Sequence, residues 1–215
     1  MKKKYLFLIG VLFIVHSIAP KLYSQYEPPP CWMDCPLSIW QLETITMRLG
    51  DICPTTPPDC FNHNLVIQFW HRHAECPDPN PPYGQISEYD CQIKSISYHE
   101  NCNNMCLDQL NIFGLYNIAL KKVYNWMVGE YGINPLDTAV WRAVNVSCWG
   151  KLTVEGQVII EYCPNFSENC CWKKYHVTQV NDVNVFTLVK AYIPEGAPPN
   201  CAHDTKPCYY YCDMI

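Results

Sequence analysis

The sequence predicts a β-rich α+β fold, in which disulfide-stapled antiparallel sheets pack against one amphipathic helix. Three observations lead to this prediction. Fifteen cysteines follow an apolar leader, and this density in an exported chain is typical of a disulfide framework. Several segments alternate apolar and polar residues with the two-residue period of a strand. One segment, residues 108–129, carries apolar residues at helical spacing instead.

The N-terminus has the pattern of a secretory signal peptide. Lys2, Lys3 and Lys4 form a basic start, and residues 5–19 are almost entirely apolar. This apolar run is shorter than the roughly 20 residues that a membrane-spanning helix needs. We expect cleavage near Ser24, with an uncleaved anchor as the alternative. The mature protein is then secreted or held in the cell envelope, with no membrane span.

The charge balance excludes some partners. The chain carries 15 basic and 20 acidic side chains, a formal net charge of −5. The leader contains lysines and no acid, so its removal leaves a more acidic protein. After the leader, no basic run is longer than a pair, whereas binding to a phosphate backbone needs clustered Lys and Arg. We therefore expect no nucleic-acid partner.

Composition divides the chain into four parts. We expect the signal peptide at 1–24, an N-terminal Cys-rich β region at 25–107, a helix and linker at 108–132, and a C-terminal Cys-rich β region at 133–215. The helix is the one element available to cover strands that are apolar on both faces.

Three strands are expected before the helix. Residues 44–49, 65–73 and 91–99 each alternate apolar and polar positions. The segments between them, 51–64 and 76–84, are rich in Pro, Asp and Cys. Because proline cannot donate to a strand ladder, both segments are predicted to be loops.

Residues 108–129 are predicted to form the helix. Asp108 is a candidate N-cap, and Gly129 or Gly132 is a candidate stop. The apolar stripe is expected to be a core face. Its members recur at three- and four-residue steps: Leu110, Phe113, Tyr116, Leu120, Val123, Met127 and Tyr131.

Strands return after the helix. Residues 139–149 are predicted to form one strand. Residues 152–160 are predicted to form a hairpin that turns at Glu155–Gly156, and residues 172–193 a second hairpin that turns at Asn181–Asp182. Both turns contain residue types that tolerate positive φ, as tight hairpin turns require.

All fifteen cysteines are disulfide candidates. Each native bridge is expected to contribute about 2–4 kcal/mol, mainly by restricting the unfolded chain. The spacing does not reveal the connectivity. Because fifteen is odd, seven bridges would leave one cysteine, which is a free thiol, the link in a covalent dimer, or a sign that the set is not all oxidised. The candidates are Cys31, Cys35, Cys53, Cys60, Cys76, Cys91, Cys102, Cys106, Cys148, Cys163, Cys170, Cys171, Cys201, Cys208 and Cys212.

Clusters of histidine and cysteine raise the alternative of a metal site. His71 and His73 precede Cys76, and His99 lies close to two other cysteines. Zinc prefers four nitrogen or sulfur ligands in a tetrahedral array, but no four-ligand spacing recurs here. We therefore expect no metal and no other cofactor. A secreted metal-binding protein that uses His71, His73, His99 and Cys76 stays as the alternative.

No motif of an enzyme is present. The chain lacks the glycine-flanked nucleophilic serine of hydrolases, the paired-histidine motif of zinc proteases and a phosphate-binding glycine loop. Cysteine–histidine neighbours are expected by chance at this composition, and no pair of carboxylates stands out as a glycosidase pair. We expect no enzymatic activity, with a hydrolase acting on surface polymers as a less favoured alternative.

Aromatic residues point toward binding. The chain holds seven Trp and fifteen Tyr, and exposed aromatic rings favour glycan stacking or protein contacts. The function expected from the sequence is therefore a secreted, disulfide-rich structural or binding protein. Its expected partners are extracellular proteins or glycans.

Overall fold

The computed structural model of this protein describes most of the chain between residues 39 and 210. The predicted signal peptide at 1–24 lies outside the described residues, and so does most of the tail after residue 192. The described ranges are 39–54, 58–77, 85–102, 105–132, 140–146, 148–162, 170–180, 183–192 and 209–210.

The described strands form one nine-stranded sheet, and a long helix packs on it. This confirms the predicted β-rich α+β class with one packing helix. The strands are β1 (Gln41–Arg48), β2 (Asn64–Pro77), β3 (Gln85–His99), β4 (Val140–Val146), β5 (Cys148–Val154), β6 (Gln157–Tyr162), β7 (Cys170–Val180), β8 (Val183–Tyr192) and β9 (Tyr209–Tyr210).

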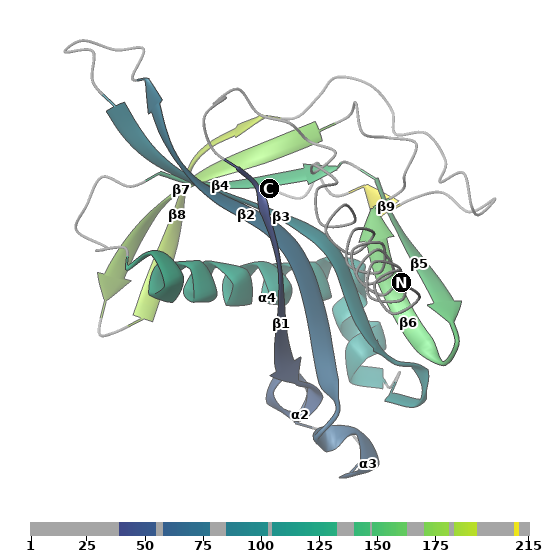
Figure 1. The fold of residues 1–215 in the computed structure, drawn as a ribbon. Helices are drawn as coiled ribbons and strands as arrows, with labels where there is room; N and C mark the ends of the chain where they lie inside the picture. The colour runs from purple at the N-terminus through teal and green to yellow at the C-terminus, as the bar shows by residue number, and fades with distance from the viewer. Residues whose placement is uncertain are drawn as a thin grey trace, which may run out of the picture.

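Strand β3 is the centre of the sheet. On one side it pairs antiparallel with β2, and β1 pairs with the far side of β2. On the other side, Glu88–Cys91 of β3 pair with β4, whereas Ser95–His99 pair with β6. The sheet therefore divides into two arms, β4–β7–β8 and β6–β5–β9. Figure 1 shows both arms diverging from the long β2 and β3 strands.

One strand pair differs from the antiparallel expectation. β3 and β4 are parallel, and the long helix α4 (Met105–Tyr131) connects them. Parallel neighbours need a crossover long enough to return to the same edge, and a helix is the usual solution. The helix is therefore the connection that places β4 beside β3, as well as the cover of the sheet.

The apolar stripe of α4 is confirmed as a core face. Tyr116, Leu120, Val123 and Met127 are buried, and the remaining stripe residues are half-buried against the same core. The helix begins before the predicted N-cap, Asp108, and continues past Gly129 to Tyr131. In Figure 1, α4 lies along one face of the sheet.

Asn111 divides α4 into two segments that differ in direction, as Figure 1 shows. Its φ of 48° and ψ of −175° are not helical. Its Oδ1 accepts hydrogen bonds from the N–H groups of Phe113 at 2.9 Å and Gly114 at 3.2 Å, as the side chain of an N-cap does. The N-cap of the longer segment is thus Asn111, and the prediction of Asp108 was wrong because the residues before it also form helix.

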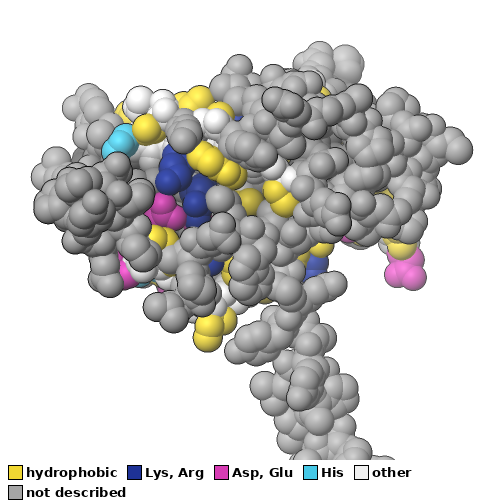
Figure 2. Space-filling model, turned by 90° about the horizontal axis from the view of Figure 1, so that it is seen from above, with side chains coloured by type: hydrophobic (Ala, Val, Ile, Leu, Met, Phe, Trp, Pro, Cys, Tyr) yellow, Lys and Arg dark blue, Asp and Glu magenta, His cyan; other side chains and the backbone are white. Residues whose placement is uncertain are grey.

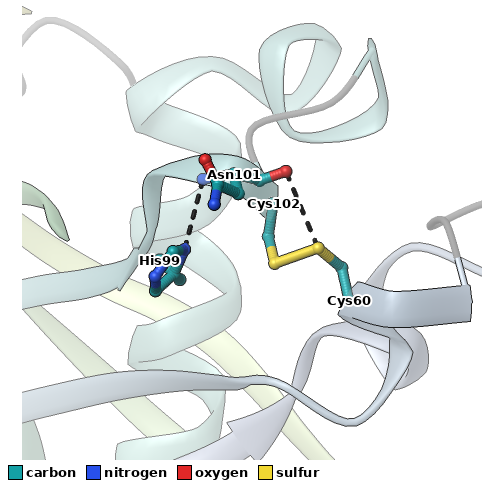
Figure 3. The surroundings of a disulfide bond; sticks show 4 residues. All are labelled: Cys60, His99, Asn101 and Cys102. Atoms are coloured by element: carbon teal, nitrogen blue, oxygen red, sulfur yellow. Dashed lines mark hydrogen bonds between the residues drawn. A yellow bond between two sulfur atoms is a disulfide. The ribbon is translucent and has the colours of Figure 1, made fainter. Parts of the chain in front are cut away.

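Two short helices occur where a loop was predicted at 51–64: α3 (Pro58–Phe61) lies within this segment, and α2 (Leu49–Ile52) begins two residues before it. A disulfide between Cys60 of α3 and Cys102 ties α3 to the 3₁₀ turn η1 (Glu100–Cys102) after β3. Figure 3 shows this bond beside Asn101, whose N–H donates to His99 Nδ1 at 3.3 Å. The disulfide thus joins the segment between β1 and β2 to the turn that follows β3.

The predicted strands before α4 are confirmed, but their ends differ. β2 runs to Pro77, so Cys76 and Pro77 of the predicted loop at 76–84 belong to a strand, and β3 begins at Gln85 rather than Cys91. The rest of that predicted loop, 78–84, lies outside the described residues. A register shift at Gln68/Phe69 leaves Lys94 without an opposite residue in β2. Strict alternation would place Ile93 and Ile96 on opposite faces, yet both are buried in the same core. The bulge at Lys94 is the reason.

The strands after α4 follow the predicted hairpins. Glu155 and Gly156 connect β5 to β6 with φ values of 49° and 79°, and positive φ at both positions is typical of a tight hairpin turn. Val180 pairs with Val183 in the second hairpin, β7–β8. The single strand predicted at 139–149 is instead two strands, β4 and β5, which pair with different partners.

Removal of the Cys60–Cys102 bond tests its contribution to stability. The paired substitutions Cys60→Ala and Cys102→Ala are expected to lower the free energy of unfolding by about 4 kcal/mol, because the unfolded chain regains the freedom of a loop of about 42 residues. Chemical denaturation of both proteins under the same oxidising conditions measures the difference. A loss below about 1 kcal/mol would show that the bond does little to hold the fold.

Candidate functional site

The two faces of the sheet differ in chemistry. Phe69 of β2 contacts Trp126 of α4, and Trp141 of β4 contacts Tyr124, so these strand residues face the helix. Side chains alternate along a strand. Arg72 and the neighbour of Trp141, Arg142, therefore point to the face away from α4. This second face carries the most unusual group of side chains in the described structure.

Four strands each place one charged residue at the same register on this face. Arg72 is opposite Asp90, Asp90 is beside Arg142, and Arg142 is opposite Lys174. Glu88 lies on the same face of β3 and contacts the last two of these residues. We call these five residues the charged row.

Asp90 is the centre of the charged row. Its Oδ2 accepts hydrogen bonds from Arg72 Nε at 2.7 Å and Arg142 Nη2 at 2.9 Å, and its Oδ1 accepts one from Arg142 Nε at 2.8 Å. The Asp90 side chain is 0% exposed, and that of Arg72 is 1% exposed. A carboxylate without water is stable only with such paired partners.

Glu88 extends the charged row to β7. Its Oε2 lies 3.0 Å from Arg142 Nη2, and its Oε1 accepts a hydrogen bond from Lys174 Nζ at 3.0 Å. The Sγ atom of Cys76 lies 3.6 Å from the same carboxylate. The charged row thus contains three cations and two carboxylates, which leaves an excess of positive charge.

Half-buried aromatic residues border the charged row. Arg72 Cζ lies 4.6 Å from the ring centroid of Trp40, and Lys174 Nζ lies 5.8 Å from that of Trp172. Both distances are within the range of cation–π attraction. Tyr162 is also half-buried and packs near Trp70. We call Trp40, Tyr162 and Trp172 the aromatic rim.

The space-filling view in Figure 2 looks onto the molecule from above the view of Figure 1. It shows Lys and Arg side chains beside acidic ones, with hydrophobic side chains around them. This is the mixture of groups that the charged row and the aromatic rim bring together.

Two polar side chains on this face, those of Gln92 and Trp40, have a buried polar atom without a hydrogen-bond partner among the described residues. Gln92 follows Asp90 by two residues and pairs in register with Trp70. Its side chain is 1% exposed, and neither its amide nitrogen nor its amide oxygen has a hydrogen-bond partner within the described structure. The indole N–H of Trp40 is likewise buried and has no hydrogen-bond partner there. A buried amide without partners costs about 1–3 kcal/mol, so this position works against stability.

The opposite face holds a histidine–tyrosine cluster at the end of α4. The side chain of His71 contacts Trp126 and shares a hydrogen bond of 2.6 Å, at its Nδ1 atom, with the hydroxyl of Tyr131. Burial lowers the pKa of His71, and burial together with the nearby Glu130 charge raises the pKa of Tyr131 to about 12. Both groups are therefore neutral near pH 7, as a packed core requires.

A serine, a histidine and a glutamate meet nearby, but they do not form a catalytic relay. The Nε2 atom of His73 lies 3.2 Å from Glu75 Oε1 and 3.5 Å from Ser87 Oγ. A relay needs the nucleophile on one ring nitrogen and the acid on the other. Here both contacts use the same nitrogen, and Ser87 Oγ donates directly to Glu75 Oε1.

The residues of the predicted metal alternative lie apart. His71 and His73 are on the α4 side of β2, and the ring of His73 stacks on Tyr89. Cys76 is disulfide-bonded and lies beside Glu88 on the other face. His99 lies at the far end of β3, where its ring contacts His63. Within the described ranges no group of three or more His, Cys, Asp or Glu side chains could hold a metal ion.

Among the cysteines whose side chains the structure describes, all but one are bonded. Six of them take part in disulfides: Cys53, Cys60, Cys76, Cys102, Cys170 and Cys171. Cys91 of β3 is free and buried. A buried thiol cannot reach a second molecule while the protein is folded, so Cys91 is not suited to link a covalent dimer.

Cys91 lies under α4, on the core side of the sheet. Burial raises the pKa of its thiol, the neighbouring Asp90 charge raises it further, and a hydrogen bond with Tyr124 opposes the rise. The thiolate is the form that attacks disulfides. The raised pKa and the burial of this thiol therefore both disfavour its exchange with a disulfide.

Comparison of the chain with protein-family models, curated proteins and solved structures found no match. Among the helices of the described residues, none is both long enough and apolar enough to cross a membrane. The function must therefore be argued from the geometry of this chain alone.

Sequence reasoning missed the charged row and Gln92. In an alternating strand, Arg72, Asp90 and Arg142 occupy positions that usually face water. Two of them are 52 residues apart, and no motif connects them. One signal was present for the free thiol, because Cys91 alternates with Tyr89 and Ile93 inside a strand instead of lying in a Pro-rich loop.

Asp90→Asn tests the charged row. The substitution removes the charge that neutralises two buried guanidinium groups, so the free energy of unfolding is expected to fall by about 3–5 kcal/mol. The matched control is Glu75→Gln in the exposed part of β2, which is expected to change it by less than about 1 kcal/mol. Denaturant unfolding measures both, and equal small effects would contradict the buried pairing.

Alkylation tests the state of Cys91. Iodoacetamide is expected to leave this thiol unmodified in the native protein and to modify it once denaturant is added without reductant, because burial protects it. Peptide mass spectrometry identifies the modified residue. Rapid labelling of Cys91 under native conditions would contradict its position in the core.

Proposed function

We propose that the mature chain is an exported, non-enzymatic binding protein, and that it contacts a glycan through the aromatic rim and Lys174, the half-buried end of the charged row. The observation that carries the proposal is the set of groups on this face. Half-buried rings lie beside buried cations, carboxylates and an amide without partners. The disulfides and the predicted leader support an extracytoplasmic location.

The aromatic rim supports a sugar ligand. A pyranose ring presents C–H groups on one face and hydroxyls at its edge, so it stacks on an aromatic ring while its hydroxyls bond to polar groups. Trp40, Tyr162 and Trp172 supply rings, and Lys174 is also half-buried beside Trp172. The amphipathic character of Trp and Tyr suits a contact of this kind.

The side-chain amide of Gln92 also supports the proposal of a glycan ligand. It has one acceptor oxygen and two donor hydrogens, and neither atom has a partner among the described residues. A ligand hydroxyl can donate to this oxygen and accept from this nitrogen. The cost of an unpaired amide is offset when a ligand satisfies it.

Binding to soluble polysaccharides, with Trp172→Ala as the site variant, tests the proposal. The variant is expected to weaken binding about tenfold, since a stacked ring contributes about 1 kcal/mol or more. The matched control is Phe61→Ala, an exposed aromatic of α3 away from this face, which is expected to bind as the wild type does. Affinity electrophoresis in polysaccharide gels measures all three.

The outcomes separate the proposal from its rivals. Absence of binding to every polysaccharide, or equal binding by the Trp172 variant, contradicts the glycan site. Cleavage of a bound polysaccharide, detected as new reducing ends, contradicts the non-enzymatic part.

Gln92→Leu separates a binding role from a purely structural one. The substitution removes a buried amide without partners, so the free energy of unfolding is expected to stay the same or rise by about 1 kcal/mol. Binding of the glycan is expected to weaken at the same time. A stability gain without a loss of binding would remove Gln92 from the site.

A further inference from the structure

A small cavity lies between the first turns of α4 and the β6–β5 arm of the sheet, away from the charged row. Its volume is about 160 Å³. A cavity of about 150 Å³ with apolar walls is large enough to hold one benzene molecule. The five apolar or aromatic residues of its wall are all buried: Tyr98, Leu107, Ile112, Leu115 and Ile160.

Two polar residues complete the lining, and both are exposed. Lys151 of β5 pairs in register with Ile160 of β6, and opposite residues of an antiparallel pair point to the same face. Asn111, the residue that divides α4, is the other. The cavity therefore has a buried apolar wall and an exposed polar rim.

Both rim residues have unused donors. Lys151 makes no ion pair and no hydrogen bond with any residue that the structure describes, although it is a full positive charge. The Oδ1 atom of Asn111 accepts hydrogen bonds from the N–H groups of Phe113 and Gly114. The side-chain amide nitrogen of Asn111 is not used in these bonds and can donate to a ligand. The second segment of α4 also begins here, and the N-terminal end of a helix favours negative charge.

We propose that this cavity binds a small amphipathic carboxylate, with an apolar body of about six carbons inside and its carboxylate at the rim beside Lys151. The wall excludes water from the apolar body, and burial of that surface drives binding. The rim supplies a cation and an amide donor, which match a carboxylate better than an alcohol. This site does not depend on the glycan proposal, because the two use different residues and different parts of the sheet.

Ligand-detected NMR titrations with sodium hexanoate, hexan-1-ol and sodium acetate test the proposal. Hexanoate is expected to bind, hexan-1-ol to bind more weakly, and acetate to show no binding because it lacks the apolar body. Lys151→Gln is expected to weaken hexanoate binding about fivefold and to leave hexan-1-ol binding unchanged. Lys121→Gln, an exposed lysine of α4 that does not line the cavity, is the matched control and is expected to bind hexanoate normally.

A second variant fills the cavity. Leu115→Phe is expected to abolish binding of both hexanoate and hexan-1-ol, with the fold checked by circular dichroism. If this variant does not fold, the comparison of Lys151→Gln with Lys121→Gln still decides the question. Absence of hexanoate binding to the wild type, or equal hexanoate binding by the wild type and Lys151→Gln, would overturn the proposal.

Discussion

The carboxylate of Asp90 is held, without contact to water, between guanidinium groups from the strands on either side of it. A buried charge of this kind is tolerated only when its partners are in place. Arg72 on β2 and Arg142 on β4 must therefore be level with Asp90 before the centre of the sheet can close. A slip of one residue in either strand would move an arginine to the α4 side and leave the carboxylate unpaired. The register of the three central strands is tied to this one group.

The same constraint links the sheet to the helix. β4 reaches the edge of β3 only through α4, which covers the opposite face and buries Tyr124 and Val123 against the core. The parallel pairing brings Arg142 beside Asp90 and places Trp141 under the helix. The contacts of α4 on one face of the sheet and the ion pairs of the charged row on the other therefore both favour the same pairing of β4 with β3. Glu88 then carries the network to Lys174 and the aromatic rim, where the proposed glycan contact lies.

Local patterns predicted much of this fold. The stripe on α4 and the turn at Glu155–Gly156 follow from helical spacing and from residues that accept positive φ, and both are local properties. The charged row was not predictable in this way, because it depends on strand neighbours that are far apart in sequence. The bulge at Lys94 was hidden for a related reason, since alternation within one strand does not reveal an extra residue relative to its partner. The candidate binding face was missed altogether, since polar positions in an alternating strand look solvent-exposed until the partner strands are known.

A double-mutant cycle on Asp90 and Arg142 tests the central claim most directly. The free energy of unfolding would be measured for Asp90→Leu, for Arg142→Leu and for the double variant. If the two side chains depend on each other inside the sheet, the double variant loses less stability than the sum of the single variants, with a coupling of about 2–3 kcal/mol. A coupling near zero would mean that the carboxylate and the guanidinium are not paired, and that something other than the charged row sets the register of the central strands.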